Sequence, residues 1–433
     1  MTLPGRFVFC AVGGEEHLAR LRRAVAALRP RTAAEIVLVT DPSRTAGALP
    51  PLPRVDLSAP AGLSDRAAVI WLKTRLADLF PAGTSCYLDT DLEARGPAVD
   101  ELFAEFRPPA SFAADLTSPG ASLRTFSRHA VRCACHREGE RLERFAAEVE
   151  DLTRFHARHA AALARLSDGT LYRAPEFRGR RRFGRWGRWW RGEASGRSAD
   201  GAVAWRQRFA GGRPVEIRWR FAGEAWELER VGSSERWLHP SGAQLAWHLA
   251  AGPVDAGDGH WESPSGESFR RLSSPAGEEL LWFADGRPRR RWVPDEQHPH
   301  GGRWLDPQGR DLGECDHLAE LLERQLGVAV PRRDWLPWNG GLFLFSGASR
   351  ELLHGWWRDC ERLWRAPEAI ERDQGALVAT VWRLGLADHP RLPQRFNWIV
   401  PPRHPPREPW PEDLAFVHWI GGGPGGEAGG GQT

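Results

Sequence analysis

Two aspartates one residue apart, Asp89 and Asp91, directly follow the apolar run Cys86-Tyr87-Leu88. Carboxylates at the end of a buried strand can anchor a divalent cation that also grips a diphosphate, because such cations prefer oxygen ligands. Asp-x-Asp alone is a common pattern, and acidic residues in the turn after a strand are its plainer explanation. The elements around the motif therefore decide between the two interpretations.

The residues before this motif alternate between strand and helix patterns. Residues 6–12 form an apolar run, and residues 16–28 repeat apolar side chains at helical spacing. A second apolar run, residues 36–40, stops at Asp41, and a helical stripe over residues 67–80 precedes the strand that carries the acidic pair. Such alternation predicts a largely parallel sheet with helices on both faces, whose ligands bind at the carboxyl ends of its strands.

The composition limits the class of protein. A chain of 433 residues predicts two domains, or one domain with a large insertion. Its 59 basic and 56 acidic residues leave a formal charge of +3, which argues neither for nor against a polyanionic partner. Residues 7–12 are too short an apolar run for a signal peptide, and no stretch approaches membrane-spanning length. We expect a cytoplasmic protein without a transmembrane segment, whose six cysteines are reduced.

Tryptophan is concentrated in the middle of the chain. Twelve of the 22 tryptophans lie between Trp186 and Trp304, where helical periodicity is lost and turns such as Asp285-Gly286 separate short apolar segments. This pattern predicts an array of β-hairpins in which each unit buries its aromatic side chains against its neighbours. The phrase Trp282-Phe-Ala-Asp-Gly-Arg-Pro resembles MORN-type repeats, and residues 138–166 are expected to form one long helix before the array.

A basic and aromatic stretch, residues 178–191, opens this array. Its arginines and tryptophans could bind phosphates and stack bases, or they could form a solvated hairpin edge on which arginine stems cover tryptophan faces. The near balance of charge over the chain favours the hairpin edge, so no nucleic-acid partner is expected. The insert is expected to contact a partner or acceptor rather than to supply chemistry.

Cysteine and histidine cluster just before the insert, at His129, Cys133, Cys135 and His136. The Cys-x-Cys-His pattern lacks the two-residue gap of common zinc knuckles. Solvated or core residues are the commoner interpretation of such a cluster, and the sequence predicts no zinc site there.

The alternating pattern returns after the insert. Residues 315–326 form an amphipathic helical pattern, and Asn339, Gly340 and Gly341 precede the apolar run 342–345. Two small residues beside an amide make a surface that a sugar ring can approach, because the amide both donates and accepts hydrogen bonds. A plain turn before a core strand would have the same pattern.

The order of the motifs is more specific than any one of them. It runs Tyr-Leu-Asp-Thr-Asp at 87–91, Asn-Gly-Gly at 339–341, Arg-Asp-Gln at 372–374, Leu-Pro-x-x-Phe-Asn at 392–397 and His-x-x-Gly at 418–421. In this order the motifs resemble those of the GT-A glycosyltransferases, and most of all family 8, with its glycogenin-like and lipopolysaccharide galactosyltransferase-like members. The resemblance covers residues 5–115 and 335–423 and leaves the Trp-rich insert outside.

The resemblance implies a glycosyltransferase that moves a sugar from a nucleoside diphosphate sugar to an acceptor hydroxyl, with retention at the anomeric carbon. It favours a UDP-sugar as donor and leaves a glycan, a lipid or a protein as acceptor. It implies that Asp89, Asp91 and His418 bind Mn²⁺ or Mg²⁺. The positions that it implies at the reacting centre are Asp373, Gln374 and Asn339. Those that it implies for donor binding are Ala11, Val12, Gly13, Asp41, Lys73, Thr90, Gly340, Gly341, Asn397 and Gly421. For Lys73, a solvated position on its helix is the comparable alternative.

The predicted fold is α/β: a Rossmann-like GT-A mixed sheet with helices on both faces, interrupted by an all-β, Trp-rich meander. We expect the GT-A domain over residues 1–170 and 313–423, the insert over residues 171–312, and a disordered Gly-rich tail over residues 424–433.

One departure from the family pattern opens an alternative. In that family the terminal His-x-x-Gly leads to a Lys-Pro-Trp segment whose cation stabilises the leaving diphosphate, whereas Gly422-Gly-Pro-Gly-Gly-Glu follows here. The missing charge would come from Lys73 or an arginine of the insert. Alternatively, the α/β domain is inert and the insert binds a protein or glycan partner. A nucleotidyltransferase is disfavoured, because Gly13-Gly14-Glu15-Glu16 is acidic where a basic Gly-rich loop is usual.

Overall fold

The chain divides into two compact units, each described here by itself. The α/β unit comprises Met1–His136 and Glu314–Thr433, and the β unit comprises Arg137–Gly313. The insert therefore begins at Arg137, earlier than the expected boundary at residue 171. The computed structural model describes residues 5–115, 122–142, 155, 158, 176–184, 187–198, 201–211, 213–224, 226–231, 234–238, 244–247, 260–262, 267–274, 277–294, 302–311, 314–370, 372–400 and 410–419.

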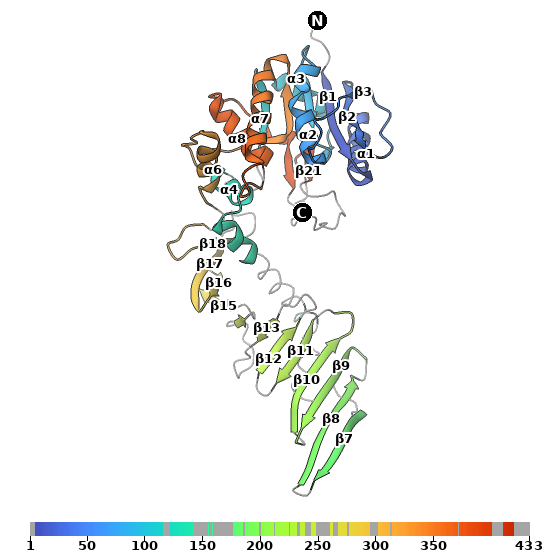
Figure 1. Ribbon diagram of the computed structural model, residues 1–433, viewed down its shortest axis with the longest axis vertical. Helices are drawn as coiled ribbons and strands as arrows, with labels where there is room; N and C mark the ends of the chain where they lie inside the picture. The colour runs from blue at the N-terminus through green and yellow to red at the C-terminus, as the bar shows by residue number, and fades with distance from the viewer. Residues whose placement is uncertain are drawn as a thin grey trace. The chain divides into compact units, whose positions relative to one another are not determined.

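A six-stranded mixed sheet forms the centre of the α/β unit (Figure 1). Its strands, in spatial order, are β3 (Arg54–Asp56), β2 (Glu35–Thr45), β1 (Arg6–Gly13), β4 (Ser85–Leu88), β19 (Trp338–Phe345) and β6 (Ala110–Ala114). The first four run parallel to one another, and β19 is antiparallel to both of its neighbours. The alternating patterns of the N-terminal region are thus confirmed as a mixed α/β arrangement.

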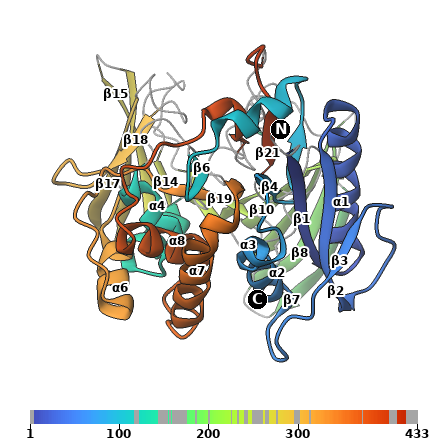
Figure 2. The same cartoon turned by 90° about the horizontal axis from the view of Figure 1, so that it is seen from above.

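Helices cover both faces of this sheet (Figure 2). They are α1 (Glu15–Leu28), α2 (Asp65–Thr74), α3 (Leu76–Leu79), α4 (Leu123–Ala130), α6 (His317–Leu326), α7 (Arg350–Leu363) and α8 (Arg372–Arg383). Short 3-10 turns span Arg29–Arg31, Ala98–Glu105, Gly347–Ser349 and Gln394–Phe396.

Alternate side chains of β1 enter two different cores, as the two-residue period of a strand requires. Phe7 and Phe9 pack with Leu18 and Leu21 of α1. Val8 and its alternate neighbours face the opposite way, into a core shared with α2, α6, α7 and α8. A strand that is buried on both faces explains the uninterrupted apolar run of residues 7–12.

The α/β unit also contains a separate three-stranded sheet. It consists of β20 (Trp398–Val400), β21 (Phe416–Trp419) and β5 (Leu92–Ala94), in that order. Since β5 follows β4 after a three-residue turn, the Asp-Thr-Asp motif connects the two sheets.

The β unit contains an antiparallel meander of twelve strands, each paired with its neighbour in sequence. The strands are β7 (Glu176–Gly184), β8 (Gly187–Arg197), β9 (Val203–Ala210), β10 (Arg213–Phe221), β11 (Glu227–Val231), β12 (Ser234–Leu238), β13 (Gln244–Trp247), β14 (His260–Glu262), β15 (Glu267–Ser274), β16 (Gly277–Ala284), β17 (Arg287–Pro294) and β18 (Gly302–Leu305).

The tryptophans and glycine turns of this meander act as expected of a hairpin array. Trp205 and Trp219 lie directly opposite each other on β9 and β10, and both are buried. Asp285 and Gly286 join β16 to β17 with φ of 55° and 70°, the left-handed pair that a two-residue hairpin turn needs. The side chains of the basic stretch at 178–190, most of the expected helix at 138–166 and the tail at 424–433 lie outside the described residues.

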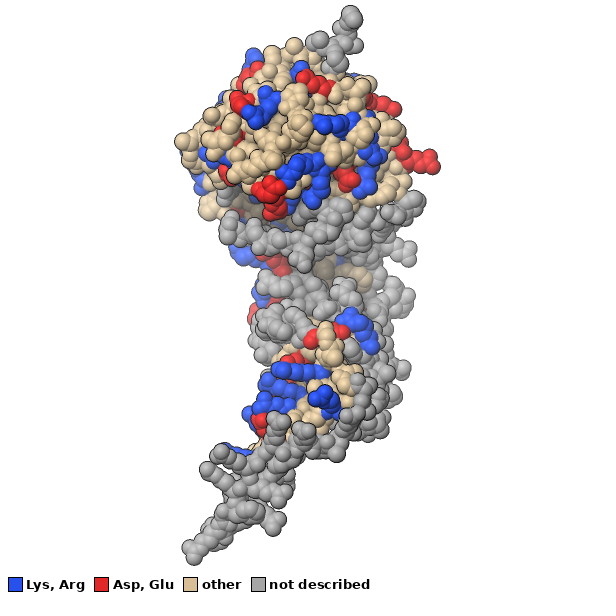
Figure 3. Space-filling model, turned by 90° about the vertical axis from the view of Figure 1, so that its right-hand side faces the viewer, with Lys and Arg blue, Asp and Glu red and all other residues tan. Residues whose placement is uncertain are grey.

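Charge is mixed over the α/β unit. On the face seen in Figure 3, basic and acidic side chains of this unit alternate with uncharged ones. Among the described residues, no helix is long and apolar enough to cross a membrane.

Candidate metal centre

The Asp-Thr-Asp motif is held by backbone hydrogen bonds where β4 ends and β5 begins. The amide of Asp89 donates to the carbonyl of Gly341 on β19 (2.8 Å), and the amide of Leu92 donates back to the carbonyl of Asp89 (3.2 Å). The turn is thereby tied to both sheets. Its two carboxylates sit at the carboxyl end of β4, at the edge where the sequence predicted ligands to bind.

His418 reaches this turn through strand pairing. It lies on β21, which runs antiparallel to β5 with His418 opposite Leu92. The amide of Trp419 donates to the carbonyl of Asp91 (3.0 Å), which extends the pairing into the turn. One ligand atom from each of Asp89, Asp91 and His418 lies within 4.8 Å of the others. The structure therefore brings together the three predicted metal ligands.

Asp89 is oriented by two side chains that hold the same oxygen. The Tyr87 hydroxyl donates to Asp89 Oδ1, and Lys73 Nζ lies 3.4 Å from that atom. Lys73 is only 3% exposed, and its ammonium lies 4.6 Å from the ring centre of Tyr87 and 5.3 Å from that of Trp356. The interpretation of Lys73 as a solvated helical residue is wrong. With Oδ1 engaged, Oδ2 is the oxygen that remains for a cation.

Asn397 fixes the tautomer of His418. Asn397 Oδ1 lies 2.9 Å from His418 Nδ1, and both side chains are buried. A carbonyl oxygen can only accept, so Nδ1 carries the hydrogen and Nε2 presents its lone pair. That nitrogen lies 3.3 Å from Asp91 Oδ1. A metal-ligating histidine commonly has its other nitrogen held in this way.

Asp91 Oδ1 is an orphaned buried acceptor. The atom is enclosed and accepts no hydrogen bond from the described residues, although His418 is near it. A buried carboxylate oxygen normally has a partner, because leaving it without one costs free energy. The side chains fit a divalent cation, which would coordinate this oxygen together with the imidazole. Two carboxylates and one imidazole are ligands that several divalent cations accept.

The charges of the three groups shift one another's pKa values. For Asp89, burial raises the pKa and the charge of Asp91 adds to it, against the opposing effect of Lys73. Burial also opposes ionisation of Asp91, but the charge of His418 outweighs it and lowers the pKa of Asp91. Burial would lower the pKa of His418, and the carboxylate of Asp91 reverses this, so the pKa is raised. The neighbouring carboxylates thus favour the protonated imidazole more than burial alone would, and a cation would compete with that proton for Nε2.

Gly341 has no room for a side chain beside the triad. A Cβ at this position would lie 2.6 Å from His418 Cε1 and 3.0 Å from Asp89 Oδ2. The Gly341 amide donates to Asn339 Oδ1 within the same segment (2.9 Å). The register of β19 against β6 shifts between Asn339 and Phe343, so this segment bulges out of regular pairing. The Asn-Gly-Gly motif is therefore placed directly at the metal ligands.

Gln374 joins the same bulge from α8. Its Oε1 accepts the amide of Gly340 (3.1 Å), and a Cβ at 340 would lie 2.7 Å from the ring of Trp356. The neighbouring Asp373 is partly exposed, with Oδ1 3.7 Å from Arg66 Nη2, and its carbonyl accepts the Trp356 indole N–H (2.6 Å). Asn339, Gly340, Gly341 and Gln374 thus form one connected group at the triad.

Of the remaining predicted donor-binding residues, four lie on the two strands next to β4 in the sheet. Ala11, Val12 and Gly13 are at the carboxyl end of β1, the strand next to β4. Asp41 is on β2, one strand further, and is fully buried. Thr90 lies in the turn between the two aspartates, and Gly421 is outside the described residues.

The carboxylate of Asp41 accepts hydrogen bonds from residues near the carboxyl end of β2 and from Ala59. Oδ1 accepts the amide (2.9 Å) and the hydroxyl (2.6 Å) of Ser43, and Oδ2 accepts the amide of Ala59 (2.9 Å). Arg44 Nε lies 3.4 Å from Oδ2. Burial opposes ionisation, but these donors outweigh it and lower the pKa of Asp41. Its side chain therefore shapes the loop that borders β2.

Sequence reasoning missed the residues that support the triad from the side. Tyr87 was read as part of an apolar strand, although its hydroxyl holds Asp89. Trp356 was one of several tryptophans in a helical pattern, although it borders Lys73 and the Gly340 position. Asp115, which follows β6, is buried and contributes to the raised pKa of His418. Of these three residues, only Asp115 has a signal in the sequence that points to the site, because it directly follows an apolar strand.

A surface hollow of about 960 Å³ lies elsewhere on the α/β unit. It is lined by residues of α2 and α7, including Trp71, Arg75, His354 and Trp357. None of the residues that line it is a predicted site residue, and neither of the two possible metal-binding groups found among the described residues lies there. We therefore place the candidate site at the triad, where the chemistry is, and not at this hollow.

Comparison with known proteins adds no assignment. No protein-family model matches the chain, and no curated protein matches it. The interpretation of this centre accordingly depends on the arrangement of its own side chains.

Proposed function

We propose that this protein is a metal-dependent glycosyltransferase of the GT-A type, which moves a sugar from a nucleoside diphosphate sugar to an acceptor hydroxyl. The observation that carries this proposal is the meeting of Asp89, Asp91 and His418 within 4.8 Å, from segments at opposite ends of the chain. A turn of two acidic residues would occur by chance far more often than this turn together with a buried histidine oriented to face it.

The sheet supports the GT-A assignment. The four parallel strands place Asp41, Ala11 to Gly13 and Asp89 along one edge, at strand carboxyl ends. Ligands of open α/β sheets bind along that edge. A nucleoside would lie against the ends of β1 and β2, and its diphosphate would reach β4.

The protein would hold Mn²⁺ with Asp89 Oδ2, Asp91 Oδ1 and His418 Nε2. A cation bound there would neutralise the negative charge that develops on the diphosphate as the bond to the sugar breaks. Tyr87 and Lys73 keep Asp89 in place, and Asn397 keeps the imidazole in the ligating tautomer. These supports lower the cost of organising the site at the moment of reaction.

The sugar would lie over the bulge of β19. Gly340 and Gly341 are buried and neither position has space for a Cβ, so this backbone lies close against Trp356 and the metal ligands. Asn339 and Gln374 hold that backbone in shape through their carbonyl oxygens. Asp373 lies in the first turn of α8, beside this group, and is the acidic residue that we assign to the reacting centre. A UDP-sugar is the favoured donor. Retention at the anomeric carbon is the favoured outcome.

Release of nucleoside diphosphate tests this function. The full chain is incubated with UDP-, GDP- and dTDP-sugars in Mn²⁺, with and without a pool of glycan, lipid and peptide acceptors. We expect turnover of one donor class that EDTA abolishes. Asp91→Asn should lose this turnover and keep the wild-type circular dichroism spectrum, because the substitution removes a ligand and leaves the strand intact.

Two outcomes would contradict the proposal. Background release over the whole panel, from protein that binds Mn²⁺, would favour an inert α/β unit whose insert binds a partner. Unchanged turnover in Asp91→Asn would remove the metal centre from the reaction.

A further inference from the structure

A second group of metal-ligating side chains forms in the α/β unit where the chain leaves it and returns. Cys133 and Cys135 lie just before His136, the last residue of the first segment, and Cys315 and His317 lie just after the second segment begins at Glu314. The sequence predicted no zinc among His129, Cys133, Cys135 and His136. That prediction considered only neighbours in sequence, and the fold adds two ligands from beyond the insert.

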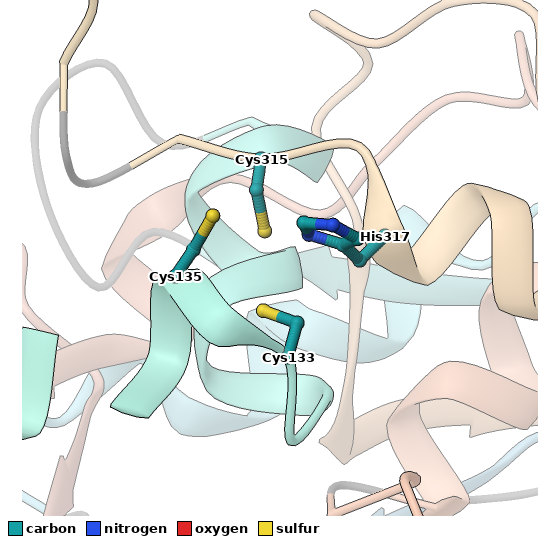
Figure 4. Close-up of side chains that lie close together, drawn as sticks. All are labelled: Cys133, Cys135, Cys315 and His317. Atoms are coloured by element: carbon teal, nitrogen blue, oxygen red, sulfur yellow. The ribbon is translucent and has the colours of Figure 1, made fainter. Parts of the chain in front are cut away.

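The four side chains converge on one point (Figure 4). One ligand atom from each of the four lies within 4.8 Å of the others. Zn–S bonds of about 2.3 Å in a tetrahedron place sulfur atoms about 3.8 Å apart. The ligand atoms, within 4.8 Å of one another, are thus at most about 1 Å further apart than in that geometry. The imidazole of His317 is directed at the sulfurs rather than away from them (Figure 4).

His317 carries an orphaned nitrogen. Its Nδ1 is enclosed and has no hydrogen-bond partner among the described residues. Histidine Nδ1 is satisfied either by a hydrogen bond or by a metal, so this atom indicates a partner that protein groups do not supply. The other nearby histidine differs, because His136 Nδ1 lies 2.8 Å from the carbonyl oxygen of Arg128. This contact marks His136 as a structural histidine, whereas His317 remains the candidate ligand.

Two of the sulfurs are already oriented by hydrogen bonds. The amide of His136 donates to Cys133 Sγ (3.3 Å). The Ser127 hydroxyl lies 3.2 Å from Cys315 Sγ and accepts the amide of Leu318 (2.8 Å), which leaves its hydrogen for the sulfur. Donors of this kind commonly surround thiolates that bind a metal.

The backbone around the cluster is also tied together. The amide of Cys315 donates to the carbonyl of Arg124 on α4 (3.2 Å), and the Arg124 side chain forms a salt bridge with Asp316 (2.9 Å). The start of α6 is thereby held against α4 by groups other than the cluster itself. The cluster is consequently preformed, which reduces the entropy lost when an ion binds.

We propose that Cys133, Cys135, Cys315 and His317 form a structural zinc site. Three thiolates and an imidazole select a soft or borderline ion, in contrast to the oxygen-rich triad at Asp89. Four protein ligands fill the tetrahedral coordination of zinc and leave no position for substrate. The ion would hold together the two points at which the chain leaves the α/β unit and returns to it. This site is independent of the proposed transferase activity.

Zinc content tests the site in the full chain. Tag-free protein is prepared under reducing conditions in the Asp91→Asn background, so that the triad does not add metal. We expect about one zinc per chain after gel filtration in metal-free buffer. Cys133→Ser and Cys315→Ser should each lower this content by about tenfold or more, and His317→Gln should lower the affinity. His136→Gln is the matched control and should retain zinc.

Cobalt provides a readout that needs no substitution among the four residues of the proposed zinc site. The Asp91→Asn protein loaded with Co²⁺ should show the thiolate-to-metal charge-transfer absorption and the intense visible bands of tetrahedral coordination. Chelation should remove these bands and make three more thiols reactive.

Three results of the metal measurements would overturn the proposal. They are zinc content below one tenth of the chain concentration in reduced Asp91→Asn protein, equal zinc content in Cys315→Ser and His136→Gln, and a cobalt spectrum without thiolate bands. A disulfide between two of the three cysteines in protein isolated without reductant would assign the cluster to a covalent clamp instead and would also overturn it.

Discussion

His418 and Asn397 form a buried hydrogen bond in which Nδ1 of the imidazole donates to the amide oxygen at 2.9 Å. This bond decides which nitrogen faces the aspartates. It also joins the motifs Leu-Pro-x-x-Phe-Asn and His-x-x-Gly, whose Asn397 and His418 are 21 residues apart in the sequence. The parallel pairing of β20 with β21 brings these motifs side by side.

Removing the Asn397 amide should weaken the metal centre without removing a ligand. Asn397→Ala is expected to lower Mn²⁺ affinity by about 10–100-fold, the usual effect of losing a residue that orients a ligating histidine. Titration with Mn²⁺ followed by electron paramagnetic resonance measures this affinity. Asn397→Asp should retain most of it, because a carboxylate also accepts from Nδ1. Equal affinities in wild type and Asn397→Ala would contradict the orienting role.

Adding a methyl group at Gly341 should disrupt the triad. In Gly341→Ala the new Cβ would lie 2.6 Å from His418 Cε1 and 3.0 Å from Asp89 Oδ2, so at least one ligand must move. We expect Mn²⁺ affinity to fall by more than about tenfold. Gly14→Ala is the matched control, because no atom lies within 4 Å of its Cβ position. A calorimetric titration that gives the same affinity for both variants would refute the predicted contact.

Metal affinity should rise with pH. The Asp91 carboxylate, acting against burial, raises the pKa of His418, and below that pKa the imidazole of the metal-free protein carries a second proton. Mn²⁺ must displace that proton, so its affinity should fall by about tenfold per pH unit below this pKa and level off above it. Isothermal titrations in buffers of different ionisation enthalpy count the released protons. His418→Gln should bind more weakly and lose this slope, and an unchanged slope would contradict the assignment.

Asp41 should stabilise the loop at its strand end in a pH-dependent way. Its folded-state pKa lies below that of the unfolded chain, so its contribution is complete above about pH 4 and is lost as the pH falls through the folded-state value. Asp41→Ala should lower the free energy of unfolding at pH 7 by about 1–3 kcal/mol, because two backbone amides and one hydroxyl lose their acceptor.

Urea unfolding at several pH values measures this contribution. Asp56→Ala is the control, since that carboxylate is 46% exposed on the neighbouring β3 and should change stability little. Equal losses in the two variants would show that the Asp41 hydrogen bonds do not hold the loop.

The α/β unit should fold without the β unit. The ligand atoms of Cys135 and Cys315 lie within 4.8 Å of each other, so a short Gly-Ser linker can replace residues 137–313. The shortened protein is expected to bind one Mn²⁺ with wild-type affinity. If it then lacks sugar transfer but still hydrolyses the donor slowly, the insert supplies acceptor binding. An unfolded product by circular dichroism would show that the α/β core depends on the insert.

The sequence by itself determined the elements of the fold and the local part of the site. Apolar runs and helical stripes located β1, α1, β2 and β4, because strand and helix periods are properties of neighbouring residues. The same reasoning placed Asp89 and Asp91 together at a strand end. Trp spacing and Gly turns likewise indicated the meander, whose strands pair only with their neighbours in sequence.

Only the tertiary structure decided which distant side chains meet. His418 reaches Asp91 because β21 pairs with β5, and Lys73 is buried because Tyr87 and Trp356 enclose it. Cys315 and His317 join Cys133 and Cys135 because α6, which follows the insert in the sequence, packs against α4, which precedes it. Periodicity carries no information about such pairs, since the free energy that brings them together comes from sheet pairing and core packing between segments far apart in the chain.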